Sequence, residues 1–229
     1  NTTLTAYPNA GTGTAPIDAR FQRSGALDET FATIRAGAGT GGDATEAATT
    51  AAGLTATATT DQFSALRRAN FGFGTSSIGT NNIDSSTFSL YGSEAATTNL
   101  GNPNLDIEAH TPVSQSATEA ADFNVAKFGG SRWATTGIAL GSISTVAYNN
   151  WTLNATGLAG INKTGNTFVG TRLSWDFDNS FGGTWSSSAT TQVIVYFADQ
   201  AGTTNDPKLV VEHSAAASTK KIPSIIWWN

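Results

Sequence analysis

The chain has 229 residues, a formal net charge of −5 and an isoelectric point near 4.9, and only 13% of its residues are charged. An acidic chain with few Lys and Arg lacks the clustered positive charge that phosphate binding requires, so we expect no nucleic-acid partner. The sequence contains no Cys, which excludes disulfides, thiolate metal ligands and a cysteine nucleophile.

The polar surface must come mainly from Thr, Ser, Asn and Gly, because the charged fraction lies well below the roughly 25% usual for globular proteins. Weakly charged surfaces of this kind suit proteins that pack side by side. No stretch approaches the ~20 apolar residues of a membrane helix, so we expect no membrane insertion. The sequence also lacks Met, so we expect that a leader was removed before Asn1 or that the ordered part begins late.

The first third of the chain predicts short strands between Gly/Thr/Ala loops. Residues 18–23 and 29–35 have the composition of strands. Between residues 37 and 60 large apolar side chains disappear, with Leu54 the sole exception. We therefore expect a long surface loop there, with at most one weakly buried edge strand at 54–60.

The clearest alternation runs from residue 63 to residue 73. One parity carries Phe63, Ala65, Arg67, Ala69, Phe71 and Phe73, and the other carries Ser64, Leu66, Arg68, Asn70 and Gly72. A strand with one largely buried face produces this pattern. A turn at 74–82 ends the strand, and the next one, 84–91, points Phe88 and Leu90 inward.

Residues 105–110 alternate apolar and polar side chains and predict a half-buried strand. His110, like His213 near the end of the chain, is expected on an outer face without a catalytic or metal-binding role. Residues 117–128 have helix-like spacing behind a cap at Ser116, and 151–161 predict the end of a strand turning into a short helix.

Two long strands follow, one with inward residues from Val169 to Phe177 and one with Val193, Val195 and Phe197. A polar turn and a last strand, 208–213, complete eight or more strands. The predicted fold is all-β, a two-sheet antiparallel β-sandwich of jelly-roll type with one or two short helices. We expect one domain over residues 1–214, followed by a linker and an apolar docking tail at 215–229.

Two segments carry a family resemblance. Residues 65–78, Ala-Leu-Arg-Arg-Ala-Asn-Phe-Gly-Phe-Gly-Thr-Ser-Ser-Ile, and residues 83–92, Ile-Asp-Ser-Ser-Thr-Phe-Ser-Leu-Tyr-Gly, resemble the central signature of the disaggregatase-related (DNRLRE-type) β-sandwich modules. In that signature an arginine-bearing strand ends in Phe-Asp and a Ser-Ser-Ile turn, and a second strand closes on Leu-Tyr-Gly. Residues 205–213 resemble the final strand of the same group, and the likeness runs in order from Ala19 to His213.

This resemblance implies a β-sandwich fold and the kinds of protein in which the module occurs. It implies no catalytic or binding residues. Such modules occur in secreted polysaccharide-active proteins, in surface proteins of bacteria and archaea, and in phage virion proteins. The Thr-rich form found here looks most like the phage and metagenomic members. Gly74 stands where the family commonly has Asp, so any turn-stabilising or ion-binding role of that carboxylate does not carry over.

Paired carboxylates are the candidates for metal or acid/base chemistry. Asp176 and Asp178 share a parity at the predicted end of a strand, as do Asp106 and Glu108. Carboxylates on one face can bind calcium or hydrolyse glycosides, and acidic residues at strand ends also protect sheet edges from pairing. We expect no resident cofactor, with calcium at Asp176 and Asp178 or at the turn of Asp28 as the alternative.

Aromatic rings near loops are candidates for sugar binding. Trp133, Trp151 and Trp185 lie beside Gly, Ser or Asn residues, and an exposed ring with amide neighbours suits a carbohydrate. Large aromatic side chains that cap the edge of a sandwich would have the same sequence pattern. Both interpretations remain open at this point.

The C-terminal sequence is too apolar to remain in water. After a linker come Ile222, Ile225, Ile226, Trp227 and Trp228, which we expect to form an assembly interface. The segment can pack back on its own sandwich, or it can dock on a neighbouring subunit, for example by strand addition to a free edge.

Nothing in the sequence forms a catalytic set, so we expect no enzymatic activity. The leading hypothesis is a structural and interaction module of a multi-subunit extracellular assembly, best matched by a phage virion protein such as a decoration, tail or fibre component. It would lie on a virion or cell surface and bind copies of itself or other subunits. The alternative is a secreted carbohydrate-binding module with glycan partners, and a third hypothesis is a polysaccharide lyase or hydrolase using Asp176 or Asp178.

Overall fold

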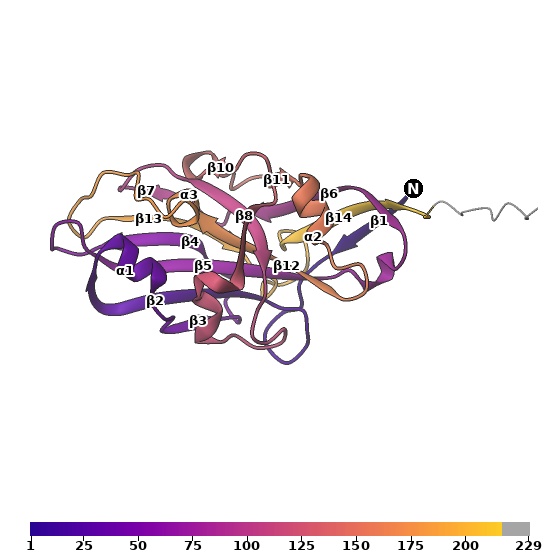
Figure 1. Ribbon diagram of the computed structural model, residues 1–229, viewed down its shortest axis with the longest axis horizontal. Helices are drawn as coiled ribbons and strands as arrows, with labels where there is room; N and C mark the ends of the chain where they lie inside the picture. Colours follow the sequence, from indigo (N-terminus) through magenta and orange to yellow (C-terminus); the bar gives the residue numbers. More distant parts are fainter. Residues whose placement is uncertain (217–229) are drawn as a thin grey trace, which may run out of the picture.

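The computed structural model describes residues 1–216 and confirms the expected all-β sandwich (Figure 1). All ladders between its named strands are antiparallel. The smaller sheet has four strands in the order β1 (Thr2–Ala6), β14 (Lys208–Ser214), β6 (Asn82–Tyr91) and β11 (Tyr148–Thr152). The N-terminus and the end of β14 lie at the same end of the molecule.

The larger sheet is built around one long strand, β5 (Phe63–Gly74). Its other strands are β2 (Asp18–Glu29), β3 (Gly41–Asp43), β4 (Ala48–Ala56), β7 (Thr97–Thr98), β8 (Asn104–His110), β9 (Phe128–Arg132), β10 (Ile138–Ala139), β12 (Asn166–Leu173) and β13 (Thr190–Tyr196). The helical elements are α1 (Phe31–Ala36), α2 (Ala155–Gly160), α3 (Ser174–Phe177), and the 3-10 turns η1 (Ser76–Ile78), η2 (Ala120–Phe123), η3 (Val125–Lys127) and η4 (Leu140–Ser142). None of the helices in residues 1–216 has the length and apolarity to cross a membrane.

The larger sheet divides at β5. One edge of β5 pairs with β2, whereas the other edge pairs first with β4 and then, from Ala69 onward, with β12. The hydroxyl of Thr171 on β12 donates to the carbonyl of Ala51 on β4 at 2.8 Å, which joins the two branches where they diverge. A twelve-residue strand is therefore shared among three neighbours.

Aromatic side chains fill the space between the two sheets. Phe71 and Phe73 of β5 contact Phe88 of β6 with ring centroids 5.6 and 5.9 Å apart, and Phe88 contacts Trp151 of β11 at 5.7 Å. Phe71 also meets Phe197 at 5.0 Å. All of these rings are buried, and each such burial stabilises the fold by roughly 1.5–3 kcal/mol. The inward directions of Phe71, Phe73 and Phe88 are those that the alternation predicted.

The second face of the larger sheet is also covered, which the alternation did not predict. Arg68 of β5 is fully buried, and Asp106, Glu108 and His110 of β8 are 3%, 1% and 5% exposed. The expectations of a half-buried strand at 105–110 and of an outward His110 are therefore wrong. The cause is a third layer of short segments that packs over this face.

The strand expected over residues 29–35 is wrong, because residues 31–36 form the helix α1. Thr30 caps the helix, since its hydroxyl accepts the backbone N–H of Thr33 at 3.4 Å, and Ile34 turns into the core. Phe31 meets Phe63 and Phe181 at the same end of the sheet. A cap followed by apolar residues three positions apart favours a helical turn over a strand.

The expected loop at 37–60 is wrong over its second half. The strand β4 lies between β5 and β13 and is buried along most of its length. Its Ala, Thr and Gly residues suit this crowded position, since a Cβ on Gly53 would lie 2.9 Å from the Cβ of Gln192. Small side chains here indicate close strand packing and not exposure.

The strand expected through Phe177 ends at Leu173, and the chain turns into α3. Trp175 and Asp176, which the alternation placed on opposite faces, are both buried. The expected short helix after residue 151 is confirmed as α2. The helix-like segment 117–128 forms two separate 3-10 turns, η2 and η3.

Candidate functional site

The densest group of charged side chains lies on the covered face of the larger sheet, with Asp176 at its centre. Arg68 donates to both Asp176 oxygens, from Nε at 2.6 Å and from Nη2 at 2.7 Å. Arg35 reaches the same carboxylate at 3.3 Å and Arg172 at 3.6 Å. Burial alone would raise the pKa of Asp176, but Arg68, Arg172 and Arg35 outweigh it and lower that pKa.

Two further ion pairs extend the group. Arg172 donates from Nε to Glu108 at 2.5 Å. Arg132 donates to Asp106 at 2.7 Å and to both oxygens of Asp178 at 2.9 Å. The described part of the chain thus brings together four arginines and four carboxylates here, so their formal charges balance. We call these eight residues the buried ion network.

Aromatic rings pack against the guanidinium groups of the buried ion network. Arg68 lies 4.1 Å from the ring centroid of Phe123, and Arg132 lies 4.0 Å from that of Phe177. Arg172 is 5.0 Å from the ring of Phe128. A Cβ on Gly170 would come within 2.7 Å of the Phe128 ring, so only glycine lets this ring approach the sheet. Contacts of this type contribute about 2 kcal/mol where they are desolvated, as at Arg68 and Arg172, and about 0.5–1 kcal/mol at a partly exposed residue such as Arg132.

This geometry favours structure over catalysis or calcium binding at Asp176. Both carboxylate oxygens already accept charge-assisted hydrogen bonds, and a cation placed there would face three guanidinium groups. Asp178 lies on the other side of the network, 53% exposed and paired with Arg132. The two residues follow a helical turn and not one strand face. Within residues 1–216 no group of three or more His, Cys, Asp or Glu side chains is arranged for a metal ion.

His110 is a neutral part of the same covered face. Its ring lies 5.2 Å from Phe21, Nδ1 is 2.9 Å from the amide nitrogen of Asn70, and Nε2 is 3.1 Å from the carbonyl of Asp122. These partners fit the tautomer with the proton on Nε2. Burial lowers the pKa of His110 to about 4. His213, expected on an outer face, is only 5% exposed and is paired with Asn81.

The three candidate sugar-binding tryptophans are buried or partly buried. Trp133 and Trp151 are 3% and 2% exposed, which favours the interpretation that these rings cap the core over the one that they bind sugar. The indole of Trp151 instead donates to the carbonyl of Leu105 at 3.2 Å. Trp185 is partly buried against the core, and its indole donates to the carbonyl of Gln62. In this protein the tryptophan rings that lie near Gly and Asn residues belong to the hydrophobic core or pack against it.

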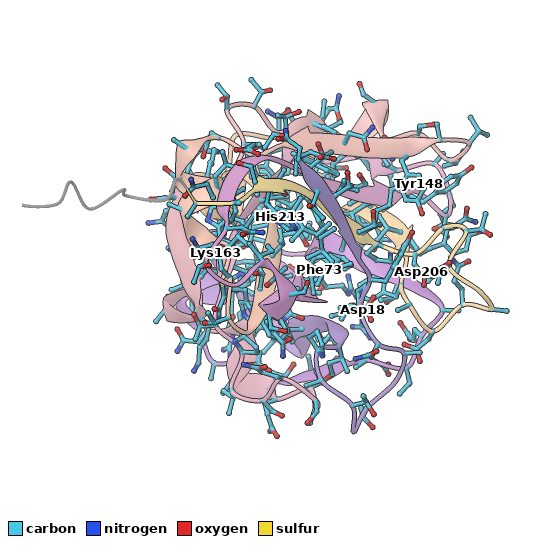
Figure 2. The ribbon with its side chains drawn as sticks, turned by 90° about the vertical axis from the view of Figure 1, so that its right-hand side faces the viewer. Asp18, Phe73, Tyr148, Lys163, Asp206 and His213 are labelled. Atoms are coloured by element: carbon cyan, nitrogen blue, oxygen red, sulfur yellow. The ribbon has the colours of Figure 1, made fainter. Side chains whose placement is uncertain are left out.

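A second buried acidic group consists of Asp18 with Asp199 and Asp206 nearby, and Figure 2 labels Asp18 and Asp206. Asp18 is fully buried; one oxygen accepts the backbone N–H of Ala198 at 2.9 Å, and the other has no partner among the described residues. Burial first, and the nearby Asp199 and Asp206 next, raise the pKa of Asp18 to about 8. Asp18 is therefore largely protonated at neutral pH.

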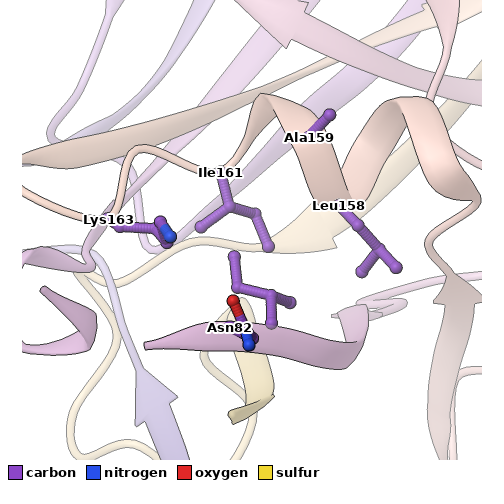
Figure 3. A pocket seen from close by; sticks show the side chains of 6 residues that line it. Asn82, Leu158, Ala159, Ile161 and Lys163 are labelled. Carbon is purple, nitrogen blue, oxygen red and sulfur yellow. The ribbon is translucent and has the colours of Figure 1, made fainter. Parts of the chain in front are cut away.

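A groove lies beside the point where β14 finishes (Figures 2 and 3). Its volume is about 440 Å³. Its walls come from the start of β6, from α2 and from the segment that follows α2, and its lining residues are Asn82, Ile83, Leu158, Ala159, Ile161 and Lys163. We call it the end groove. The predicted interface residues Ile222, Ile225, Ile226, Trp227 and Trp228 lie outside the described residues.

The sequence-based search missed Arg68, Arg172 and Asp18. Arg68 could have been suspected, since an Arg among Phe and Ala residues in a long strand must find a partner if the other face is covered. Asp18 and Arg172 carry no local signal, because nothing near them in sequence shows that they are buried. Comparison with protein-family models and with curated proteins finds no match for this chain.

Replacing Asp176 with Asn should lower the free energy of unfolding by about 3–5 kcal/mol, because Arg68 would remain buried without a compensating charge. Urea unfolding followed by fluorescence measures this. The matched control is Asp178→Asn, which loses only a partly exposed pair and should cost less than about 1 kcal/mol. Equal effects of the two changes would contradict a structural role for the buried ion network.

Replacing Asp18 with Asn should make the fold more stable above pH 8 and leave it nearly unchanged at pH 4. The pKa of Asp18 is about 8 in the folded state against a model value of 3.8, so between these values the unfolded chain releases a proton that the folded chain keeps. The contribution of Asp18 to the free energy of unfolding is therefore fully present below pH 4. It decreases as the pH rises above 4 and is lost by the time the pH passes 8. Urea unfolding at pH 4, 6 and 9 tests this, and a pH-independent difference between the two proteins would refute it.

Proposed function

We propose that this protein is a non-enzymatic structural and interaction module of a multi-subunit extracellular assembly, of the kind found as decoration, tail or fibre components of phage virions. The observation that carries the proposal is the attachment of the apolar C-terminal sequence to an interior strand. β14 lies between β1 and β6 and is hydrogen-bonded on both sides. It leads directly into residues 215–229 at one end of the sandwich.

An assembly element needs a firm anchor, and β14 supplies one. Leu209 and Val211 are fully buried in the core. Paired strands on both sides prevent β14 from sliding without breaking two ladders. A partner that binds the C-terminal segment would thereby hold the whole sandwich.

The distribution of charge supports the same proposal. The chain has 12 Lys and Arg, and four of these arginines are used inside the buried ion network. The outer surface is therefore poorer in charge than the composition indicates. Such a surface lets copies pack side by side without the desolvation of many charges. The strands β1 and β11 also form the two edges of the smaller sheet, where a partner can add a strand.

The full chain should form an oligomer that a chain stopped at Ala217 does not form. The reason is that water is a poor solvent for five large apolar side chains in one short segment. Light scattering across a concentration series measures the mass of each. The variant Trp227→Ser with Trp228→Ser should resemble the shortened chain, and Lys220→Ser with Lys221→Ser is the control that keeps the apolar residues. A full chain that stays monomeric at all concentrations would overturn the proposal.

A second candidate, a secreted carbohydrate-binding module, is supported by one hollow of about 290 Å³. It lies between the end of β11 and the loop after Trp133. Amide and hydroxyl side chains predominate in its lining, which includes Asn150, Asn154, Thr135, Thr136 and Thr152. Groups of this type can read sugar hydroxyls, although Trp151 at its base offers little ring surface.

Glycan-array binding tests this second candidate. If the hollow binds a sugar, Asn150→Ala should reduce binding at least tenfold, because Asn150 is exposed within it. Thr145→Ala, on the exposed loop before β11 and outside the hollow, is the control and should bind as the unchanged protein does. Absence of binding to any glycan would remove this candidate.

A further inference from the structure

We propose that Asp18 and Asp199 bind a calcium ion that joins the start of β2 to the loop between β13 and β14, residues 197–207. This site is separate from the buried ion network, and the inference does not depend on the proposed assembly function. Asp206 lies near the two residues, since the charges of Asp199 and Asp206 both raise the pKa of Asp18 (Figure 2 labels Asp18 and Asp206). We call Asp18, Asp199 and Asp206 the acidic cluster.

The main chain brings Asp18 and Asp199 together. The backbone N–H of Ala198 donates to Oδ2 of Asp18 at 2.9 Å, and Asp199 is the next residue of the chain. Asp206, at the other end of the loop 197–207, accepts the side-chain amide of Gln200 at 3.0 Å. The two ends of one loop thus each contribute a carboxylate near Asp18.

Two oxygens of the acidic cluster are buried and have no hydrogen-bond partner among the described residues. They are Oδ1 of Asp18 and Oδ2 of Asp199. Asp18 is fully buried, and Asp206 is 3% exposed. Buried polar atoms nearly always have a partner, so an oxygen without one in the protein indicates an ordered water or an ion. Since both oxygens belong to neighbouring carboxylates, one cation that binds both would satisfy them together.

No positive side chain of the described chain neutralises the acidic cluster. None of the salt bridges within residues 1–216 includes one of its members. Lys208 follows Asp206 by two residues, but its ammonium group lies 3.7 Å from the ring centroid of Tyr148. Asp43 adds a further negative charge near Asp199. Carboxylates that are buried together without a counterion destabilise a fold, because their charges repel and are poorly solvated.

A proton on Asp18 removes one charge but does not satisfy the buried oxygens. A protonated carboxyl group is a donor and needs an acceptor, and Oδ1 of Asp18 has none within hydrogen-bond distance in the part of the chain that the structure describes. The full burial of Asp18 also excludes a large group, such as a lysine of a partner chain. A small cation meets both requirements, and it would displace the proton that Asp18 holds in the metal-free chain.

The type of ligand favours calcium. The acidic cluster offers only oxygen atoms, from carboxylates and from the main chain of an irregular loop. Calcium accepts about six to eight oxygen ligands in variable geometry, whereas magnesium requires a nearly ideal octahedron. No set of three acidic or His side chains within residues 1–216 is arranged for a metal ion, so two carboxylates would bind the ion together with main-chain carbonyls and water.

Calorimetric titration of the full chain with CaCl₂, after dialysis against a chelator, tests this site. We expect one ion per chain with a Kd of about 10⁻⁴–10⁻³ M, as in calcium sites of extracellular modules. Asp199→Asn should weaken binding at least tenfold, because it removes a charged ligand; Asp199 is only partly buried, so the variant should fold. MgCl₂ should bind at least tenfold more weakly than CaCl₂.

The matched control is Asp61→Asn. Asp61 is exposed in the turn between β4 and β5, and it has a φ of 57°, a conformation that Asn also adopts. The substitution therefore removes one negative charge from the surface without strain. Asp61→Asn should bind calcium as the unchanged protein does.

Thermal unfolding separates a calcium site from a buried acid that only holds a proton. CaCl₂ at about 10 mM should raise the Tm of the unchanged protein by roughly 3–10 °C, because the ion binds the folded chain. The Tm of Asp18→Asn should stay constant, since this variant lacks the buried carboxylate. NaCl at equal ionic strength is the control for the screening of surface charges.

Each result that contradicts the proposal has a distinct meaning. If the unchanged chain gives neither heat nor a Tm shift with CaCl₂, the acidic cluster holds only protons or water, and the proposal is refuted. If Asp199→Asn binds calcium as tightly as the unchanged protein, the ion binds elsewhere. Equal affinities for CaCl₂ and MgCl₂ would contradict the assignment to calcium. The assembly function is tested by the oligomeric state and stands or fails independently of these results.

Discussion

The structure depends on the neutralisation of Arg68 by Asp176. Arg68 is fully buried on the central strand of the larger sheet, and a buried charge without a partner costs several kcal/mol. Its partner comes from α3, 108 residues later. Because Arg35 and Arg172 meet the same carboxylate, one side chain ties α1, β5, β12 and α3 together.

This interaction explains why the protein has a third layer. A two-sheet sandwich normally leaves the outer face of each sheet to water. Here η2, η3, β9 and α3 cover the face that carries Arg68, Glu108 and His110, and aromatic rings pack on the guanidinium groups. The covered face is polar inside and its buried charges are paired with opposite charges, whereas the opposite face of the same sheet packs on the aromatic core. β5 is therefore buried on both sides for two different physical reasons.

Because several charged side chains are paired inside the fold, they are not available for interactions at the molecular surface. Arginines that are paired within the fold cannot steer ligands or bind phosphate. The surface that remains is rich in Thr, Ser and Asn, and a groove with a mixed polar and apolar lining lies at the exit of β14. These properties support the proposal that the protein acts by contact with other subunits, with an interior stabilised by ion pairs and aromatic rings.

The amino-acid sequence by itself determined several of the strands and the aromatic inner core. The alternation around Phe71, Phe73 and Phe88 defines a strand and its buried face through residues that are close in the chain, and the same local logic gave α2. It did not determine that β4 is an interior strand, because Ala and Thr carry no signal of burial until β5 and β13 crowd them. It also could not determine the buried ion network or the acidic site around Asp18. Only the tertiary structure decided these, since Arg68 meets Asp176 and Asp18 meets Ala198 across 108 and 180 residues of chain, and long-range contacts of this kind leave no periodic trace in the sequence.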